Sequence, residues 1–206
     1  MTTKTPGVPS FWDDRYRTET YAYGVEPNDF LRTLSPHIPP GRVLCLAEGE
    51  GRNAVFLASL GYRVTAVDLS VEGLRKCARL ARQRAVDLDL VQADLAHYEP
   101  EVGAYAGVVS IFAHLPHASR ERLHARIPAA LAAGGALILE SYRPEQLRFA
   151  TGGPRDVSLL PTLAELRREL EPLDLVVAAE VEREIHEGVF HDGRSATVQL
   201  LGIKRP

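Results

Sequence analysis

The 206-residue sequence contains only two cysteines, Cys45 and Cys77. Two thiols are too few for a disulfide framework or a four-thiolate zinc site, and they indicate a reducing, cytoplasmic setting. The chain also lacks any block of Lys or Arg, and its 24 basic and 27 acidic residues leave a net charge of −3. It therefore lacks the surplus of basic residues that is typical of general nucleic-acid-binding proteins, and we expect no nucleic-acid partner.

Long apolar runs are absent as well. No apolar stretch approaches the roughly 20 residues that cross a bilayer, and residues 1–10 have one lysine and no apolar core of a signal peptide. We therefore expect no membrane partner. The composition, 45% hydrophobic and 25% charged, is that of a water-soluble globular protein, and the length suits one domain, with or without a short extension.

Short β-branched runs alternate with helical stretches from Gly41 to about Tyr142, which is typical of successive β-α units. The expected strands are 42–46, 62–67, 88–91, 108–112 and 136–140, and the expected helices are 53–58, 70 to about 84, and about 119–131. Ser70 is expected to cap the second helix, Gly61 to close the first, and Gly134-Gly135 to break the third. Because parallel strands joined by helices need right-handed crossovers, we expect one doubly wound, Rossmann-like α/β sheet with helices on both faces.

The last third of the chain has a different pattern. A helix is expected over 161–170, followed by strands at 173–185 and 196–203 that flank the turn region 186–194. This predicts an antiparallel hairpin that brings the mostly parallel sheet to about seven strands. The residues before Gly41 are rich in aromatic side chains and proline. They predict a helical and aromatic cap over 1–40, ahead of a catalytic domain over 41–206.

The segment from Ala47 to Gly51 follows the first expected strand and opens the first helix. Closely spaced small residues there let the backbone approach a ligand. Asp68 ends the next strand, where a carboxylate can accept both hydroxyls of a ribose. Asp94 follows the third strand and can accept a hydrogen bond from an adenine amino group. Each position has a purely structural alternative, a tight turn or a capping residue, but together they predict a nucleoside site at the carboxyl edge of the sheet.

A dinucleotide ligand is an alternative, because residues 49–54 satisfy the pattern G-x-G-x-x-G/A of NAD(P)-dependent oxidoreductases. Glu48 and Glu50 oppose it, since they flank the glycines where a pyrophosphate dianion would sit. The lack of a second domain and the terminal hairpin also oppose it. A module that senses a nucleotide without turning it over is a further alternative.

Several motifs together resemble class I S-adenosylmethionine-dependent methyltransferases, over essentially the whole chain. They are Val43–Ala58, Asp68, Asp94 and the terminal hairpin. Within that superfamily, residues 11–16, 23–28 and 49–53 are similar to small bacterial methyltransferases of the tellurite-resistance or thiopurine-methyltransferase-like group. The usual first motif has an acid at the strand end and a glycine two residues later, where this chain has Cys45 and Ala47.

The resemblance implies S-adenosylmethionine as the cofactor and a small-molecule acceptor for the methyl group. The cofactor-binding residues that it implies are Ala47, Glu48, Gly49, Gly51, Asn53, Asp68, Leu69, Asp94, Leu95, Ser110 and Phe112. Of these, Asp68 would face the ribose, Asp94 and Leu95 the adenine, and Glu48 would take part in holding the methionine amino group.

Methyl transfer from a sulfonium is an in-line displacement, so the enzyme mainly positions the acceptor and excludes water. The candidate catalytic residues are His114, which follows a central strand, and Tyr23 in the aromatic segment. The neighbours of His114 in sequence supply no carboxylate to orient it as a base. This favours an acceptor that arrives deprotonated or nearly so, such as a thiol or a chalcogen oxyanion like tellurite.

Other polar residues of the same loops are further candidates to face a substrate: Glu26, Asn28, Tyr142, Arg143, His186 and His191. The two histidines, with Glu187 and Asp192 nearby, are five residues apart rather than at the i, i+4 spacing of a helical metal pair, so we expect no metal site. Residues 151–154, Thr-Gly-Gly-Pro, are interpreted either as a mobile loop that closes over the site or as a plain surface turn.

Overall fold

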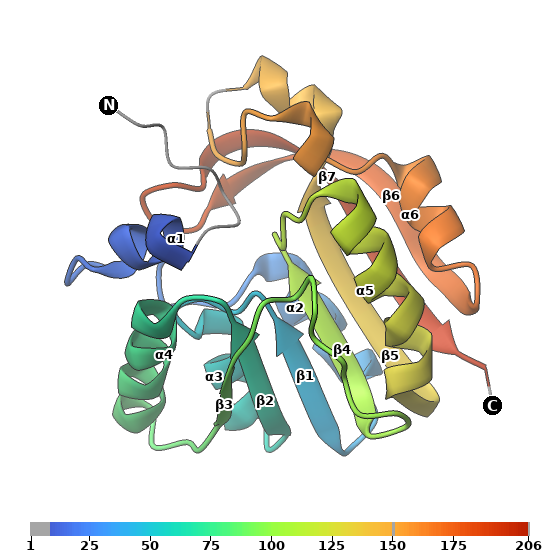
Figure 1. The fold of residues 1–206 in the computed structure, drawn as a ribbon, viewed down its shortest axis with the longest axis horizontal. Helices are drawn as coiled ribbons and strands as arrows, with labels where there is room; N and C mark the ends of the chain where they lie inside the picture. The colour runs from blue at the N-terminus through green and yellow to red at the C-terminus, as the bar shows by residue number, and fades with distance from the viewer. Residues whose placement is uncertain (1–8, 150, 206) are drawn as a thin grey trace.

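A seven-stranded mixed sheet forms the centre of the computed structural model, which describes residues 9–149 and 151–205 (Figure 1). The strand order is β3-β2-β1-β4-β5-β7-β6. The strands are β1 Arg42–Leu46, β2 Arg63–Asp68, β3 Asp89–Gln92, β4 Tyr105–Ile111, β5 Leu131–Tyr142, β6 Leu173–His186 and β7 Asp192–Lys204. The first five strands pair in parallel, whereas β7 is antiparallel to both β5 and β6. The predicted doubly wound α/β sheet with an antiparallel terminal hairpin is therefore confirmed.

Helices connect β1 to β2, β2 to β3 and β4 to β5 as expected, and other helices lie before β1 and after β5. The helices are α1 Pro9–Tyr16, α2 Asp29–Leu34, α3 Arg52–Ser59, α4 Val71–Gln83, α5 His117–Ala130 and α6 Leu163–Glu169, with short 3₁₀ turns η1 Ser35–His37, η2 Pro144–Arg148 and η3 Val157–Leu159. The side chain of Ser70 accepts a hydrogen bond from Gly73 N and so caps α4 as predicted. None of these helices is long and apolar enough to cross a membrane.

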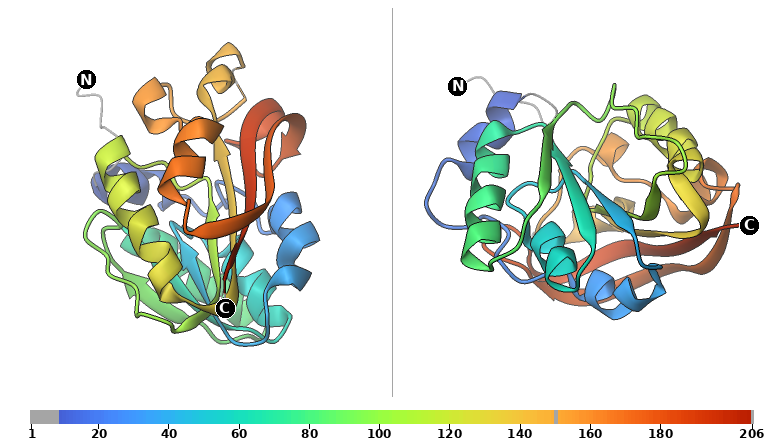
Figure 2. Two further views of the ribbon diagram at one scale, coloured as in Figure 1. Left: turned by 90° about the vertical axis from the view of Figure 1, so that its right-hand side faces the viewer. Right: turned by 90° about the horizontal axis from the view of Figure 1, so that it is seen from below.

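The two faces of the sheet bury separate apolar layers, because successive strand residues point to opposite sides. Leu44 and Leu46 of β1 join the layer under α5 and α6, and Val43 and Cys45 join the layer under α2, α3 and α4. The left view of Figure 2 shows α5 and α6 on one side of the sheet and α2 on the other. All five residues of β4 from Gly107 to Ile111 are buried, as expected of a central strand covered on both faces.

The boundary between α5 and β5 differs from the prediction. The helix ends at Ala130, four residues before Gly134, and β5 starts at once with Leu131 in an extended conformation. The pair Gly134-Gly135 therefore lies inside the strand, at the point where the pairing of β4 with β5 shifts register. A Cβ on Gly135 would lie 2.9 Å from Ala132 O, so glycine permits this irregularity rather than ending a helix.

Residues 9–40 cover the carboxyl end of the sheet with α1 and its following loop, and α1 packs against α4. Residues 1–8 of the predicted cap lie outside the described part of the chain. The terminal strands are longer than predicted, and the turn between them shortens to residues 187–191. This short turn returns toward α1 over the carboxyl ends of the parallel strands (Figure 1).

Candidate functional site

A cavity of about 880 Å³ opens at the carboxyl ends of β1, β2 and β4. Its volume lies within the roughly 300–1,000 Å³ of small-molecule sites. The sheet order reverses between β1 and β4, so the cavity occupies the crevice where ligands bind in doubly wound folds. Three parts of the chain form its wall: the loops after the parallel strands, the N-terminal segment, and the β6–β7 turn with residues 146–149 and 151–155 beside it.

Acidic side chains follow three neighbouring strands on one side of the cavity. Glu48 comes two residues after β1, Asp68 ends β2, and Asp94 follows β3, and all three border the cavity. Glu48 and Asp68 are buried, whereas Asp94 is exposed. The sequence therefore predicted correctly that these carboxyl groups would meet at one edge of the sheet.

Glu48 caps the start of α3. Its Oε1 atom accepts hydrogen bonds from Asn53 N at 2.9 Å and Ala54 N at 2.8 Å, where the helix dipole also favours negative charge. Burial nevertheless dominates and raises the pKa of Glu48 to about 7, against the opposing effect of these hydrogen bonds and of Arg52. The carboxyl group is therefore poised to become fully ionised when a cation binds beside it.

Asp68 is held by the backbone of two loops. Its Oδ2 accepts from Gly49 N at 2.8 Å and its Oδ1 from Ser70 N at 2.7 Å. Burial raises the pKa of Asp68 to about 6, and the backbone hydrogen bonds oppose that rise. A carboxylate offers about four acceptor positions, so each oxygen of Asp68 retains capacity for a ligand hydroxyl.

Aromatic rings form another part of the cavity lining. His191 lies at the centre of this aromatic wall, with ring centroids 4.5 Å from Tyr23, 4.7 Å from Phe112 and 5.3 Å from Tyr142. Tyr142 also stacks on Phe112 at 4.5 Å and on His114 at 5.6 Å. Tyr142 was a sequence candidate because it ends β5, and the structure places it behind the wall, fully buried.

The N-terminal segment adds further rings and one cation. Trp12 stacks on Tyr16 at 5.9 Å, and Arg15 lies 4.0 Å from the centroid of Phe190 while its Nη1 donates to the Tyr23 hydroxyl at 3.1 Å. All of these side chains border the cavity. Burial raises the pKa of Tyr23, against the influence of Arg15, so this phenol stays protonated and is not a base.

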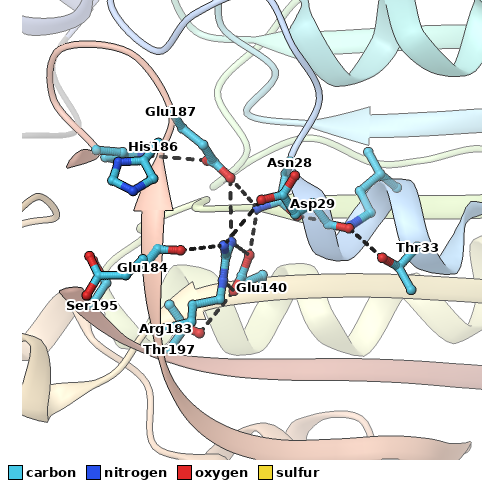
Figure 3. A network of polar contacts seen from close by, with 12 residues as sticks. Asn28, Asp29, Thr33, Glu140, Arg183, Glu184, His186, Glu187, Ser195 and Thr197 are labelled. Atoms are coloured by element: carbon cyan, nitrogen blue, oxygen red, sulfur yellow. Dashed lines mark hydrogen bonds and ion pairs between the residues drawn. The ribbon is translucent and has the colours of Figure 1, made fainter. Parts of the chain in front are cut away.

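A buried polar network supports the β6–β7 turn from below (Figure 3). Glu140 of β5 is fully buried and accepts from Arg183 Nε at 2.9 Å and Asn28 Nδ2 at 2.6 Å. The same Asn28 amide donates to Glu187 Oε1 at 2.9 Å, and Arg52 Nη2 donates to Glu187 Oε2 at 2.6 Å. The network joins the N-terminal segment, α3, β5 and the hairpin, so it fixes the turn that carries His191.

Ten of the residues predicted as site residues border the cavity. They are Tyr23, Ala47, Glu48, Asn53, Asp68, Leu69, Asp94, Leu95, Phe112 and His114. The Asn53 side chain is engaged by the protein itself, because its Oδ1 accepts from Asn28 N at 2.9 Å.

Gly49, Gly51 and Ser110 do not border the cavity. Gly49 faces the Tyr16 hydroxyl, and a Cβ on Gly51, which has a φ of +95°, would lie 2.5 Å from Cys77 Sγ. Gly51 thus allows α3 to approach α4, and its contact with a ligand stays a prediction. Ser110 is buried beside Leu139 and Arg120, away from the cavity lining, and its role at the cofactor likewise stays a prediction.

His114 borders the cavity but has few features of a base. Its ring nitrogens are buried and have no hydrogen-bond partner of good geometry among the described residues. Burial and the neighbouring His191 lower the pKa of His114 to about 3, so the ring is neutral and binds a proton poorly. It forms part of the wall.

His186 and residues 151–154 differ in their relation to the cavity. His186 is exposed, its Nδ1 is 2.6 Å from Asp192 Oδ1, and it does not border the cavity. Residues 151–154 do border it, but Thr151 is tied to β7 through its hydroxyl, which donates to Arg194 O at 2.7 Å, and its carbonyl, which accepts from Asp192 N at 3.0 Å. This supports the interpretation as an anchored turn.

Comparison with known proteins agrees with this geometry. Residues 43–135, a little under half of the chain, match the family described as "Methyltransferase domain". This segment is therefore similar to a methyltransferase domain. It spans the strands and loops that carry Glu48, Asp68, Asp94 and His114, so the predicted enzyme class is confirmed at the level of the domain.

A curated methyltransferase is also similar to this chain. Protein-L-isoaspartate O-methyltransferase of Chlorobium phaeobacteroides (strain DSM 266 / SMG 266 / 2430) is 28% identical over 142 residues, which cover 63% of this chain and 63% of the relative. The match thus spans a little under two thirds of the curated relative's length.

Solved structures show the same fold at low sequence identity. TehB from Haemophilus influenzae superimposes with a TM-score of 0.70 at 18% identity, covering 96% of this chain and 67% of TehB. A structure described as "Conversion of a Disulfide Bond into a Thioacetal Group during Echinomycin Biosynthesis" has a TM-score of 0.73 at 19% identity and covers 96% and 92% of the two chains. These likenesses establish the fold around the methyltransferase domain.

Proposed function

We propose that this protein is a methyltransferase that uses S-adenosylmethionine to methylate a small molecule at sulfur or another chalcogen. The observation that carries the proposal is that one cavity is lined both by the acidic side chains Glu48, Asp68 and Asp94 and by a cluster of aromatic rings. Methyltransferase domains of this kind take their methyl group from S-adenosylmethionine, which supplies an electrophilic methyl carbon bound to a sulfonium.

The acidic side chains suit this cofactor. Asp68 has an acceptor position left on each oxygen for the two ribose hydroxyls, and the exposed Asp94 follows the next strand, where it can accept from the adenine amino group. Glu48 is buried beside them with a raised pKa, and an ammonium group at that position would complete its ionisation. Glu48 thus replaces the strand-end acid that is absent at Cys45.

The aromatic rings suit the reacting atoms. Aromatic faces attract a cation such as a sulfonium, and sulfur makes favourable contacts with ring edges, worth roughly 0.3–1.5 kcal/mol each. Phe112, Tyr23 and His191 present such rings to the cavity, while His114 and Tyr23 are poor bases. This lining favours a soft nucleophile, such as a thiol, a selenol or an oxyanion like tellurite, because sulfur packs well against aromatic rings and such acceptors are deprotonated far more easily than an alcohol or an amide.

Two measurements test the proposal. Isothermal titration calorimetry should show binding of S-adenosylhomocysteine and no comparable binding of NAD(P)H, which separates this function from an oxidoreductase. A panel of thiol, tellurite, alcohol and amine acceptors should then release S-adenosylhomocysteine with the chalcogen compounds. Binding without release on any acceptor would indicate a sensing module, and activity confined to oxygen or nitrogen acceptors would exclude the proposed substrate class.

A further inference from the structure

His191 has a carboxylate within ion-pair distance, which His114 lacks, although its Nδ1 makes no hydrogen bond to any described residue. It is 6% exposed, borders the cavity, and lies in the β6–β7 turn only four residues after Glu187. The backbone closes this turn with a hydrogen bond of 2.7 Å from Glu187 N to His191 O. The two side chains are therefore held on the same side of a tight turn, with His191 Nδ1 3.9 Å from Glu187 Oε2.

Glu187 is fixed as a carboxylate. Arg52 Nη2 donates to its Oε2 at 2.6 Å. Asn28 Nδ2 donates to its Oε1 at 2.9 Å, and Arg183 Nη2 lies 3.5 Å from the same Oε1 (Figure 3). His191 and Arg52 lower the pKa of Glu187 to about 2 despite its burial. An ionised carboxylate beside Nδ1 favours the tautomer with the proton on Nδ1, which leaves Nε2 as the basic nitrogen.

The geometry points to His191 as the group that accepts the proton of a neutral thiol substrate, with Glu187 as its positioning residue. This inference rests on the proposed function and narrows its acceptor from chalcogens in general to thiols. As the thiol sulfur forms its bond to the methyl carbon, the bond between that carbon and the sulfonium breaks and its electron pair stays on the departing sulfur. The thiol proton passes to His191 Nε2, and the imidazolium then faces Glu187.

The surroundings of His191 fit this role. Burial lowers its pKa, so the ring is neutral before reaction, while Glu187 opposes that effect and stabilises the cation that forms. Apo proteins often hold catalytic pairs slightly too far apart, and the 3.9 Å separation from Glu187 is within ion-pair distance. The contacts with Tyr23 and Phe112 place the ring in the aromatic wall, where the acceptor is proposed to lie.

Two thiols of different acidity test the assignment. 2-Mercaptoethanol is almost entirely protonated at neutral pH, whereas 4-nitrothiophenol is already a thiolate and has no proton to lose. His191→Gln should reduce methylation of 2-mercaptoethanol by about 100-fold or more and that of 4-nitrothiophenol by less than about fivefold. Glu187→Gln should show the same dependence on the thiol with a smaller loss, because it acts through His191.

His186→Gln is the matched control, since His186 lies in the same hairpin beside a carboxylate but is exposed outside the cavity. It should retain wild-type activity with both thiols. A merely structural role of His191 would lower both activities equally, and that result would overturn the inference while the function stands. Lack of wild-type transfer to either thiol would overturn the thiol assignment itself, and lack of S-adenosylhomocysteine binding would overturn the proposed function as well.

A measurement without turnover complements these rates. ¹⁵N signals of the imidazole in the protein should show the proton of neutral His191 on Nδ1, and Glu187→Gln should remove this preference. A wild-type signal with the proton on Nε2 would contradict the assignment. Because Glu187 also neutralises Arg52, folding of the Glu187→Gln protein is checked by circular dichroism. The His191→Gln variant leaves the ion pair between Arg52 and Glu187 intact, so its rates with the two thiols test the inference without that check.

Discussion

Replacing the buried carboxyl group of Glu48 by a neutral amide should make the protein more stable. In Glu48→Gln, the side-chain oxygen can still accept from Asn53 N and Ala54 N. The charge that burial disfavours is gone. A rise of the pKa from 4.5 to about 7 corresponds to about 3 kcal/mol of free energy against the ionised form.

The sign of this effect depends on pH. Because the folded state binds the Glu48 proton more tightly than the unfolded state, its contribution to stability is fully present below pH 4.5 and is lost as pH rises through about 7. The Glu48→Gln protein should therefore equal the wild type near pH 4 and exceed it at pH 8 by up to about 3 kcal/mol. Urea denaturation at the two pH values measures the difference.

Glu50→Gln is the matched control for this experiment. Glu50 is also buried, but it forms an ion pair with Lys76, whose Nζ additionally donates to the carbonyl oxygens of Thr18 and Thr20. Removing its charge leaves a buried cation without its carboxylate, which should destabilise the protein by roughly 3–5 kcal/mol. If Glu48→Gln were also less stable than the wild type at pH 8, or if its difference did not change with pH, the balance of burial over helix capping argued for Glu48 would be wrong.

Three further outcomes are expected. Asp68→Ala should weaken S-adenosylhomocysteine binding by roughly 2–4 kcal/mol in calorimetry, through the loss of two charge-assisted hydrogen bonds, and an unchanged Kd would refute its ribose role. Gly51→Ala should lower the free energy of unfolding, measured in urea, by roughly 1–3 kcal/mol more than Gly61→Ala does. Both glycines have a φ near +95°, but only a Cβ at Gly51 would clash with Cys77, so equal losses would exclude that contact. His114→Ala should reduce methyl transfer by less than about 100-fold in an S-adenosylhomocysteine release assay, and abolished activity would show that this neutral ring is an obligatory base after all.

The parts of the fold that could be predicted from sequence are those with local causes. Residues 63–68 form a strand because β-branched and apolar residues run up to Asp68, and Ser70 starts the next helix by capping it. The same locality placed the carboxyl groups of Asp68 and Asp94 at one edge, since both follow parallel strands. Gly134-Gly135 misled the prediction because a glycine pair serves equally to end a helix or to permit a bulge, and pairing with β4 decides between them.

The other half of the site depends on contacts across long stretches of chain. Glu187 meets Arg52, 135 positions away, and Asn28, 159 positions away. No local pattern distinguishes His191, which borders the cavity, from His186, which does not. The sequence supplied both histidines as candidates. Only the three-dimensional structure distinguishes them, because it exposes His186 to solvent and buries His191 in the turn above the polar network.

The amide of Asn28 has a consequence for how the protein opens. One side chain donates to Glu140 and to Glu187, while its own Oδ1 accepts from Leu31 N at the start of α2. The hairpin turn cannot leave the sheet without removing the Asn28 donor from a buried carboxylate, and the first turn of α2 cannot unwind without losing its hydrogen bond to the same Asn28 side chain. Amide hydrogens of α2 and of the β6–β7 turn should therefore exchange with solvent through one shared opening event, as a single cooperative unit made of two segments at opposite ends of the chain.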